Sequence, residues 1–114
     1  MKAILIDPAT EAIFEVDHDP AKAGDLHKWL SDPANSVEVR ADEYLVINET
    51  NRIFIDEEAM LKNPKHFFHL QGHHDPIAGR GLVRGYREKD GRPVDTTLKV
   101  QNVRLMVRFK PRQK

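Results

Sequence analysis

The side chains with the most obvious chemical potential lie within ten residues of one another, and they are His66, His69, His73, His74 and Asp75. Imidazole nitrogens and carboxylate oxygens are competent ligands for zinc, nickel or iron. The spacing does not match the helical HExxH motif, and the glutamate base of that motif is missing. Side chains three residues apart on a strand point to opposite faces, and the last two histidines are expected in a hairpin loop. We therefore expect a solvated, turn-forming histidine pair and no cofactor. A metal-dependent enzyme that uses this cluster is the alternative.

A second candidate site is the stretch that contains Gly79, Arg80, Gly81, Arg84 and Gly85. Glycine lets a backbone approach an anion closely, and arginine binds phosphate through two parallel hydrogen bonds. The stretch matches neither the GxGxxG nor the GxxxxGK[ST] pattern, and no good helix follows to receive a phosphate at its N-terminus. The interpretation that we prefer is a strand with glycines at bulges or at close contacts.

The arginines of the second half predict a basic binding face. If residues 80–87 form a strand, Arg80, Arg84 and Tyr86 share one face, because side chains alternate between the two faces. Arginine and tyrosine are enriched at the energetic centres of protein interfaces, and aromatic rings also stack on single-stranded bases. A last strand alongside would extend this face, which would then comprise Arg80, Arg84, Tyr86, Arg87, Arg104 and Arg108.

Motifs for catalysis are missing from the sequence. Asp56, Glu57 and Glu58 could perform acid–base chemistry or hold magnesium. Acidic residues at this point also suit the start of a single helical turn over residues 57–61, which is the interpretation that we prefer. There is no GxSxG nucleophile elbow. We therefore expect a protein that is not an enzyme.

The net charge of zero conceals a division between the two halves of the chain. Residues 1–60 contain fourteen Asp or Glu and five Lys or Arg, a net charge of −9, whereas residues 61–114 contain four and thirteen, a net charge of +9. Such a division favours an anionic partner for the basic half. The alternative is that both halves interleave in one sheet, so that opposite charges lie on neighbouring strands. A net charge of zero also favours a bound or homo-oligomeric state.

The 114 residues fit one domain, which we assign to residues 1–110, followed by a flexible basic tail over residues 111–114. Without cysteine, neither a disulfide framework nor a thiolate zinc site can form. No apolar stretch approaches the roughly 18 residues that a membrane span needs. The apolar run before Asp7 is also too short for a signal peptide. We expect a cytoplasmic protein.

Prolines that follow Asp or Asn divide the chain into short elements, because the residue before proline avoids the helical conformation. Residues 2–7 and 11–17 predict a β-hairpin. Asp19 and Pro20 are typical of a helix start, and the helix is expected to end near Ser31.

Strand patterns dominate the rest of the chain, and the expected strands cover residues 37–39, 44–47, 52–56, 67–70, 77–86 and 103–109. The continuous apolar run at 44–47 predicts a strand that is covered on both faces. Residues 103–109 alternate with a period of two, although Val100, Val103 and Val107 also fit a helical turn. We prefer the strand. Short connections predict mainly antiparallel pairing, and therefore an α+β fold with one principal helix on one face of the sheet.

Three parts of the sequence resemble a group of small proteins, without an assigned activity, that bacteriophages, prophages and plasmids encode. These parts are KAILIDP at residues 2–8, IFIDEE at residues 53–58 with the LK that follows at 61–62, and the block from FF at 67–68 to PIAGRGLVRG at 76–85. Members of that group have an aromatic residue and a proline where this chain has His73 and His74, which argues against a metal site.

The resemblance implies an accessory protein of a mobile element, and such proteins often bind host machinery. We therefore expect a non-enzymatic binding protein that engages a host protein or nucleoprotein complex through the basic face, a defence system being one candidate target. Direct binding of nucleic acid or a nucleotide by the same face is the alternative.

Overall fold

Antiparallel strand pairing organises the fold, as the short connections in the sequence predict. The computed structural model describes residues 1–22, 24–31, 44–56, 58–59 and 65–109. Within these residues every strand pair is antiparallel. The helices and strands in chain order are β1 (Lys2–Asp7), β2 (Ala12–Asp17), α1 (Asp25–Leu30), β3 (Tyr44–Val46), β4 (Asn51–Ile55), β5 (Phe67–Leu70), β6 (Ile77–Ala78), β7 (Gly81–Tyr86), β8 (Pro93–Val94), α2 (Val100–Met106) and β9 (Val107–Arg108). The predicted α+β class is confirmed.

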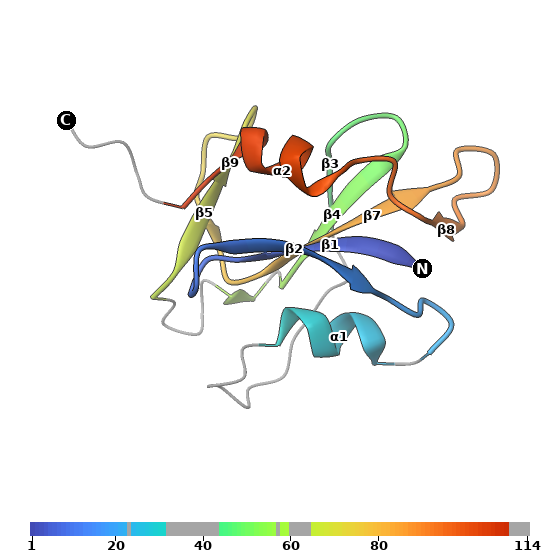
Figure 1. Cartoon of the computed structure of the whole chain (residues 1–114), viewed down its shortest axis with the longest axis horizontal. Helices are drawn as coiled ribbons and strands as arrows, with labels where there is room; N and C mark the ends of the chain where they lie inside the picture. Colours follow the sequence, from blue (N-terminus) through green and yellow to red (C-terminus); the bar gives the residue numbers. More distant parts are fainter. Residues whose placement is uncertain (23, 32–43, 57, 60–64, 110–114) are drawn as a thin grey trace.

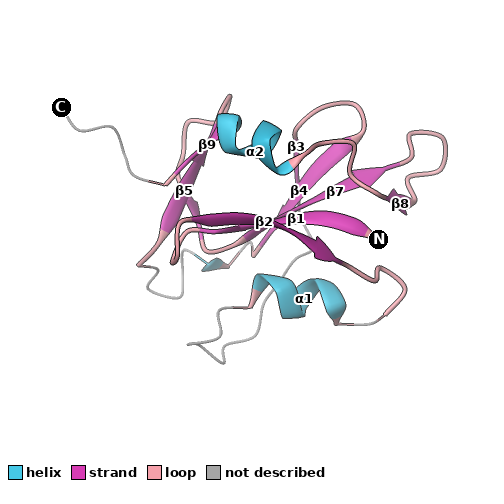
Figure 2. Cartoon of the chain, in the orientation of Figure 1, coloured by secondary structure: helices cyan, strands magenta, loops and turns pink. Residues whose placement is uncertain are grey.

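The larger sheet places a late strand between two early ones. Its strand order is β2-β1-β7-β4-β3, and β8 pairs with β7. Because β7 comes from the basic half and its neighbours β1 and β4 come from the acidic half, the two halves interleave. A smaller sheet has the order β6-β5-β9. Figure 2 shows that β9 continues directly from α2 and lies beside β5.

Both faces of the larger sheet are packed with apolar side chains. One face packs against α1, and its buried core consists of Ala3, Leu5, Val16, Leu30, Phe54 and Leu82. The other face packs against α2 and the smaller sheet, and its core consists of Ile4, Ile6, Ile13, Ile53, Phe68, Leu70, Ile77, Val83, Val103 and Val107. The two helices therefore lie on opposite sides of the sheet (Figure 1). In the described residues no helix is long and apolar enough to cross a membrane.

Close packing explains the glycines of β7. A Cβ atom on Gly85 would collide with the carbonyl oxygen of Asp95, and one on Gly81 would lie 2.9 Å from the Phe68 ring. Gly79 has a φ of +79° and separates β6 from β7, so the single strand expected over residues 77–86 is two strands. The structure thus agrees with glycines at close contacts.

The predicted start of the first helix is wrong by several residues. The Asp19 side chain accepts a hydrogen bond from the Ala21 N–H, and the Lys22 N–H bonds to the Asp19 carbonyl, so these residues form a turn. Gly24 has a φ of +84°, which a right-handed helix does not accommodate. The helix can begin only after this glycine, at Asp25, and it ends at Leu30.

The preference for a strand over residues 103–109 is also wrong, because residues 100–106 form α2 and only Val107 and Arg108 are in a strand. In a strand, Val103 and Leu105 would share a face. Instead Val103 is fully buried while Leu105 is 84% exposed. The alternative spacing of valines at positions 100, 103 and 107 describes the segment better, because the apolar contacts of these residues recur at helical intervals.

The expectation that residues 44–47 are covered on both faces is wrong as well. Tyr44 is 40% exposed and Val46 is 56% exposed. Tyr44 lies opposite Phe54, and the core beneath α1 ends at that phenylalanine. The expected strand at 37–39 and the tail at 111–114 lie outside the described residues, and only residues 58–59 of the turn expected at 57–61 are described.

Candidate functional site

Five side chains form what we call the arginine–aromatic surface: Tyr44, Arg52, Phe54, Arg84 and Tyr86. They come from β3, β4 and β7 and lie on the face of the sheet that packs against α1. The register fixes this arrangement, because Tyr44 lies opposite Phe54 and Arg52 lies opposite Arg84. Alternation along each strand places the remaining member, Tyr86, on the same face. The surface begins where the apolar core beneath α1 ends.

Each arginine of this surface is stacked on aromatic rings. The guanidinium carbon of Arg52 lies 3.6 Å from the centre of the Tyr86 ring and 4.2 Å from that of Tyr44. The guanidinium carbon of Arg84 lies 4.2 Å from the centre of the Phe54 ring. Cation–π contacts of this kind are worth about 0.5–1 kcal/mol each at exposed sites and more where water is excluded. The rings therefore hold both guanidinium planes in place.

A buried histidine also holds Arg84. His18, which is 1% exposed, has its Nε2 atom 3.1 Å from an Arg84 side-chain nitrogen and its Nδ1 atom 2.6 Å from the Asp25 carboxylate. Arginine can only donate hydrogen bonds, so Nε2 must accept, and Nδ1–H must then donate to Asp25. The contacts assign a neutral imidazole to this arrangement.

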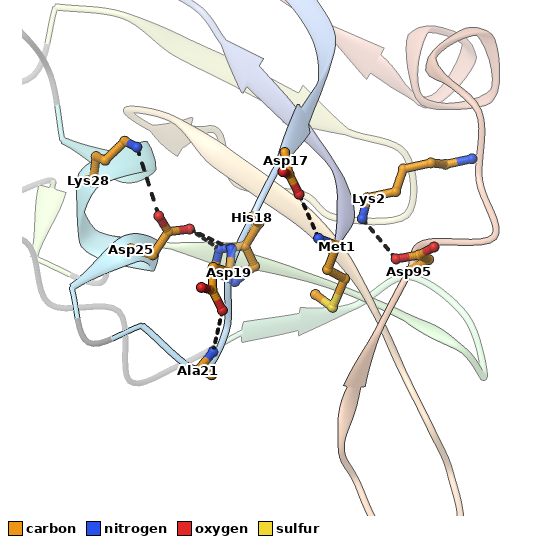
Figure 3. Close-up of polar contacts among 9 residues, drawn as sticks. All are labelled: Met1, Lys2, Asp17, His18, Asp19, Ala21, Asp25, Lys28 and Asp95. Carbon is orange, nitrogen blue, oxygen red and sulfur yellow. Dashed lines mark hydrogen bonds and ion pairs between the residues drawn. The ribbon is translucent and has the colours of Figure 1, made fainter.

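Backbone contacts set the position of His18. It follows β2, and its N–H donates to the carbonyl of Met1 at 2.8 Å, which extends the β1–β2 ladder by one step. The N-terminal ammonium group lies 2.6 Å from the Asp17 carboxylate. Figure 3 shows His18, which directly follows β2, and Asp25, the first residue of α1, pointing toward each other.

Asp25 is stabilised as a carboxylate although it is buried. Burial raises the pKa of its carboxyl group, but hydrogen bonds from the Asp19 N–H and from His18 lower the pKa by more, and Lys28 adds a smaller attraction. The pKa of Asp25 therefore lies below its ordinary value. Two consecutive hydrogen bonds, from His18 to Asp25 and from Arg84 to His18, therefore connect a buried negative charge to the arginine–aromatic surface.

Arg52 and Arg84 are two like charges on directly opposed residues. Burial lowers the pKa of the Arg84 guanidinium, and the neighbouring Arg52 charge lowers it further. Within the part of the chain that the structure describes, neither arginine forms an ion pair with a carboxylate. The Nε atom of Arg52 is also buried without a hydrogen-bond partner there. The positive charge of this pair is not neutralised by the described residues.

The predicted basic face is only partly assembled. Arg84 and Tyr86 belong to the arginine–aromatic surface. Arg80 is paired within the fold: its guanidinium lies 3.2 Å from the Asp7 carboxylate and 3.4 Å from the Trp29 carbonyl. Arg87 pairs with Asp90 at 3.1 Å.

The last two predicted residues of the basic face lie elsewhere. Arg104 is on α2 and Arg108 is on β9, and both are exposed. These elements pack on the side of the larger sheet away from α1. The structure therefore does not bring Arg104 and Arg108 together with Arg84.

The candidate metal ligands do not converge. His66 directly precedes β5, and His69 lies on it. The loop between β5 and β6 contains His73, His74 and Asp75, as expected for a hairpin. The described residues contain no group of three or more His, Cys, Asp or Glu side chains that could hold a metal ion. The loop borders an open hollow of about 270 Å³, whose other walls include Leu45 and Ile55.

Sequence reasoning missed His18, Asp25 and Arg52 as site residues. Arg52 was visible only as a cation inside an apolar strand, and its importance depends on which strand lies beside β4. His18 and Asp25 are seven residues apart, and the turn between them brings them together. A histidine between acidic residues at the end of a strand was the available signal.

No protein-family model, curated protein or solved structure matches the chain.

Proposed function

We propose that the chain is a non-enzymatic binding protein that engages an acidic surface of a partner protein through the arginine–aromatic surface. The observation that carries this proposal is the opposed pair of Arg52 and Arg84, which is stacked on aromatic rings and lacks a carboxylate partner in the described residues. An acidic partner would supply a negative charge that no described residue provides.

The composition of the surface favours a protein over a nucleic acid. Tyrosine, phenylalanine and arginine are enriched in protein interfaces. Tyr44 and Val46, at the margin of the surface, expose apolar area that a protein partner can cover. A nucleic acid is held mainly by many cations along its phosphates. Arg80 and Arg87, which could have supplied such cations, are paired with Asp7 and Asp90.

The biological setting belongs to the same proposal. The resemblance to small proteins of bacteriophages and plasmids supports a mobile-element origin and a host protein or nucleoprotein complex as the target. A host defence system is one such target. The proposed cytoplasmic location rests on the sequence, which lacks cysteine and has only a short apolar run before Asp7.

Affinity capture from a host lysate, followed by mass spectrometry and by binding assays with the purified partner, tests this function. The double variant Arg52→Gln, Arg84→Gln should lose the partner. The matched control Arg104→Gln, Arg108→Gln removes the same charge from the side of the sheet away from α1 and should retain the partner. Circular dichroism checks that both variants fold. Equal capture by the two folded variants contradicts the proposal, and capture that nuclease treatment abolishes indicates nucleic-acid binding instead.

A further inference from the structure

Among the described residues, no carboxylate neutralises the two guanidinium groups that Arg52 and Arg84 place side by side. Like charges on directly opposed residues destabilise a sheet. Elsewhere in the same region the chain pairs its cations, as Arg80 with Asp7 and Arg87 with Asp90. An anion bound between Arg52 and Arg84 would remove the repulsion between them.

The way in which the two arginines are held leaves hydrogen-bond donors for such an anion. Ring faces orient Arg52 and Arg84, and stacking uses no N–H group. A guanidinium group has five N–H donors. Of these, His18 accepts one from Arg84. The Nε atom of Arg52 is buried, so only the terminal N–H groups of this arginine could meet an anion from outside. In the part of the chain that the structure describes, the bond to His18 is the one hydrogen bond that these two guanidinium groups donate, and the N–H edge of a planar guanidinium group matches the two oxygens of a carboxylate.

His18 makes the position of Arg84 depend on a buried contact. Its Nε2 atom accepts a hydrogen bond from Arg84 while its Nδ1–H donates one to Asp25. The Asp25 carboxylate therefore favours the tautomer whose Nε2 atom is free of a proton and can accept from Arg84. His18 is thus a positioning residue, because it acts on a bound anion only through Arg84.

We infer that Arg52 and Arg84 form an oxyanion site that takes one carboxylate group of the acidic partner, and that His18 positions Arg84 for this contact. The inference rests on the proposed function, because it names the chemical group that the arginine–aromatic surface recognises. A carboxylate is favoured over a phosphate because the proposed partner is a protein, whose surface anions are the carboxylates of Asp and Glu.

Titration of the ¹⁵N-labelled full chain with an N-acetylated, amidated hexaglutamate peptide tests the site. The arginine side-chain N–H signals should shift saturably with hexaglutamate and not with hexaglutamine. Arg52→Lys and Arg84→Lys should each weaken binding by about tenfold or more, because lysine loses the planar fork of donors. The control Arg104→Lys should bind as the unchanged chain does. Unchanged affinity in both surface variants overturns the inference, as does saturable binding of inorganic phosphate but not of hexaglutamate.

Two substitutions of His18 separate positioning from stability. Glutamine can place an acceptor oxygen near the Nε2 position and so retain the bond to Arg84, whereas the shorter asparagine can only replace Nδ1 and its bond to Asp25. Each variant loses one buried contact, so a purely structural role predicts equal effects on peptide affinity. Positioning predicts that His18→Gln binds hexaglutamate more tightly than His18→Asn, and equal affinities would overturn that role.

The two proposals can fail separately. If hexaglutamate binds as expected while Arg52→Gln, Arg84→Gln still captures the host partner, the oxyanion site stands and the proposed function fails. If capture depends on the two arginines but hexaglutamate does not bind, the oxyanion site fails alone.

Discussion

At the scale of single residues, a buried acid and a neutral histidine support a surface arginine. Asp25 is 8% exposed, yet the Asp19 N–H, His18 and Lys28 surround it with donors. A buried carboxylate with this many partners stays ionised. The charge of Asp25 therefore fixes both the tautomer of His18 and the place of Arg84, and it makes the stability of the fold depend on pH.

Replacing Asp25 by asparagine should reduce stability at neutral pH and flatten its dependence on pH. The pKa of Asp25 is below its ordinary value of 3.8 in the folded chain, so the unfolded chain binds this proton more readily. The stabilisation is complete above the ordinary pKa and is lost as the pH falls through the folded pKa. Loss of these charge-assisted hydrogen bonds should cost about 1–3 kcal/mol at pH 7.

Urea unfolding at several pH values between neutrality and strong acid measures this effect. Asp17→Asn is the control, because Asp17 is 94% exposed and its ion pair with the N-terminus should matter little. If Asp25→Asn kept the full acid sensitivity of the unchanged chain, the assignment of a depressed pKa to Asp25 would be wrong.

The sequence predicted only part of this site. Alternation along one strand was enough to place Arg84 and Tyr86 on the same face. Arg52 could not be assigned, because its role depends on β4 and β7 being neighbours, which no local pattern specifies. The pairing of Arg80 with Asp7 was equally hidden, because it joins residues 73 positions apart.

At the scale of elements, one exposed leucine shows what a local pattern can miss. Alternation over residues 103–109 suggested a strand, but the Asn102 side chain accepts a hydrogen bond from the Lys99 N–H at the start of α2. Such a bond satisfies a backbone donor at a helix start. Leu105 is then exposed on α2, where an apolar side chain breaks the expected pattern.

The helix α2 predicts opposite outcomes for two neighbouring apolar residues. Val103→Ala should destabilise the fold by about 2 kcal/mol, because it removes fully buried methyl groups from the core between α2 and the sheet. Leu105→Ala should leave stability nearly unchanged, because this side chain is 84% exposed. Thermal or urea unfolding of both variants measures the contrast, and similar losses would support a strand in place of α2.

Close packing at β7 predicts a second contrast between glycines. Gly85→Ala should cost about 1–3 kcal/mol through overpacking, because the added Cβ meets the backbone of Asp95. The control is Gly72→Asn, where no atom lies within 4 Å of a Cβ and only the φ of +89° opposes a side chain, so its cost should be smaller than that of Gly85→Ala. Equal unfolding midpoints for the two variants would contradict the close contact at Gly85.

At the scale of the whole molecule, the order of strands explains the charge division. Residues 1–60 contribute β1 to β4, and residues 61–114 contribute β7, which lies between β1 and β4. Both apolar cores draw residues from the two halves, as Leu5 and Leu82 do on one face and Ile53 and Val83 on the other. The sequence indicated both the division and the interleaved alternative, but only the sheet order decides between them.

This arrangement predicts that neither half folds alone. A peptide of residues 1–60 lacks the strand that joins β1 to β4, and a peptide of residues 61–114 lacks both neighbours of β7. Mixed together, the halves should restore the strand signal in circular dichroism and a cooperative thermal transition. Because their net charges are −9 and +9, association should be slower in high salt. At 1 M salt the Debye length falls to about 3 Å, so charges attract each other only at very short range. Cooperative unfolding of either peptide by itself would show that the halves do not depend on each other for folding. Association at the same rate in low and high salt would show that their opposite charges do not speed it.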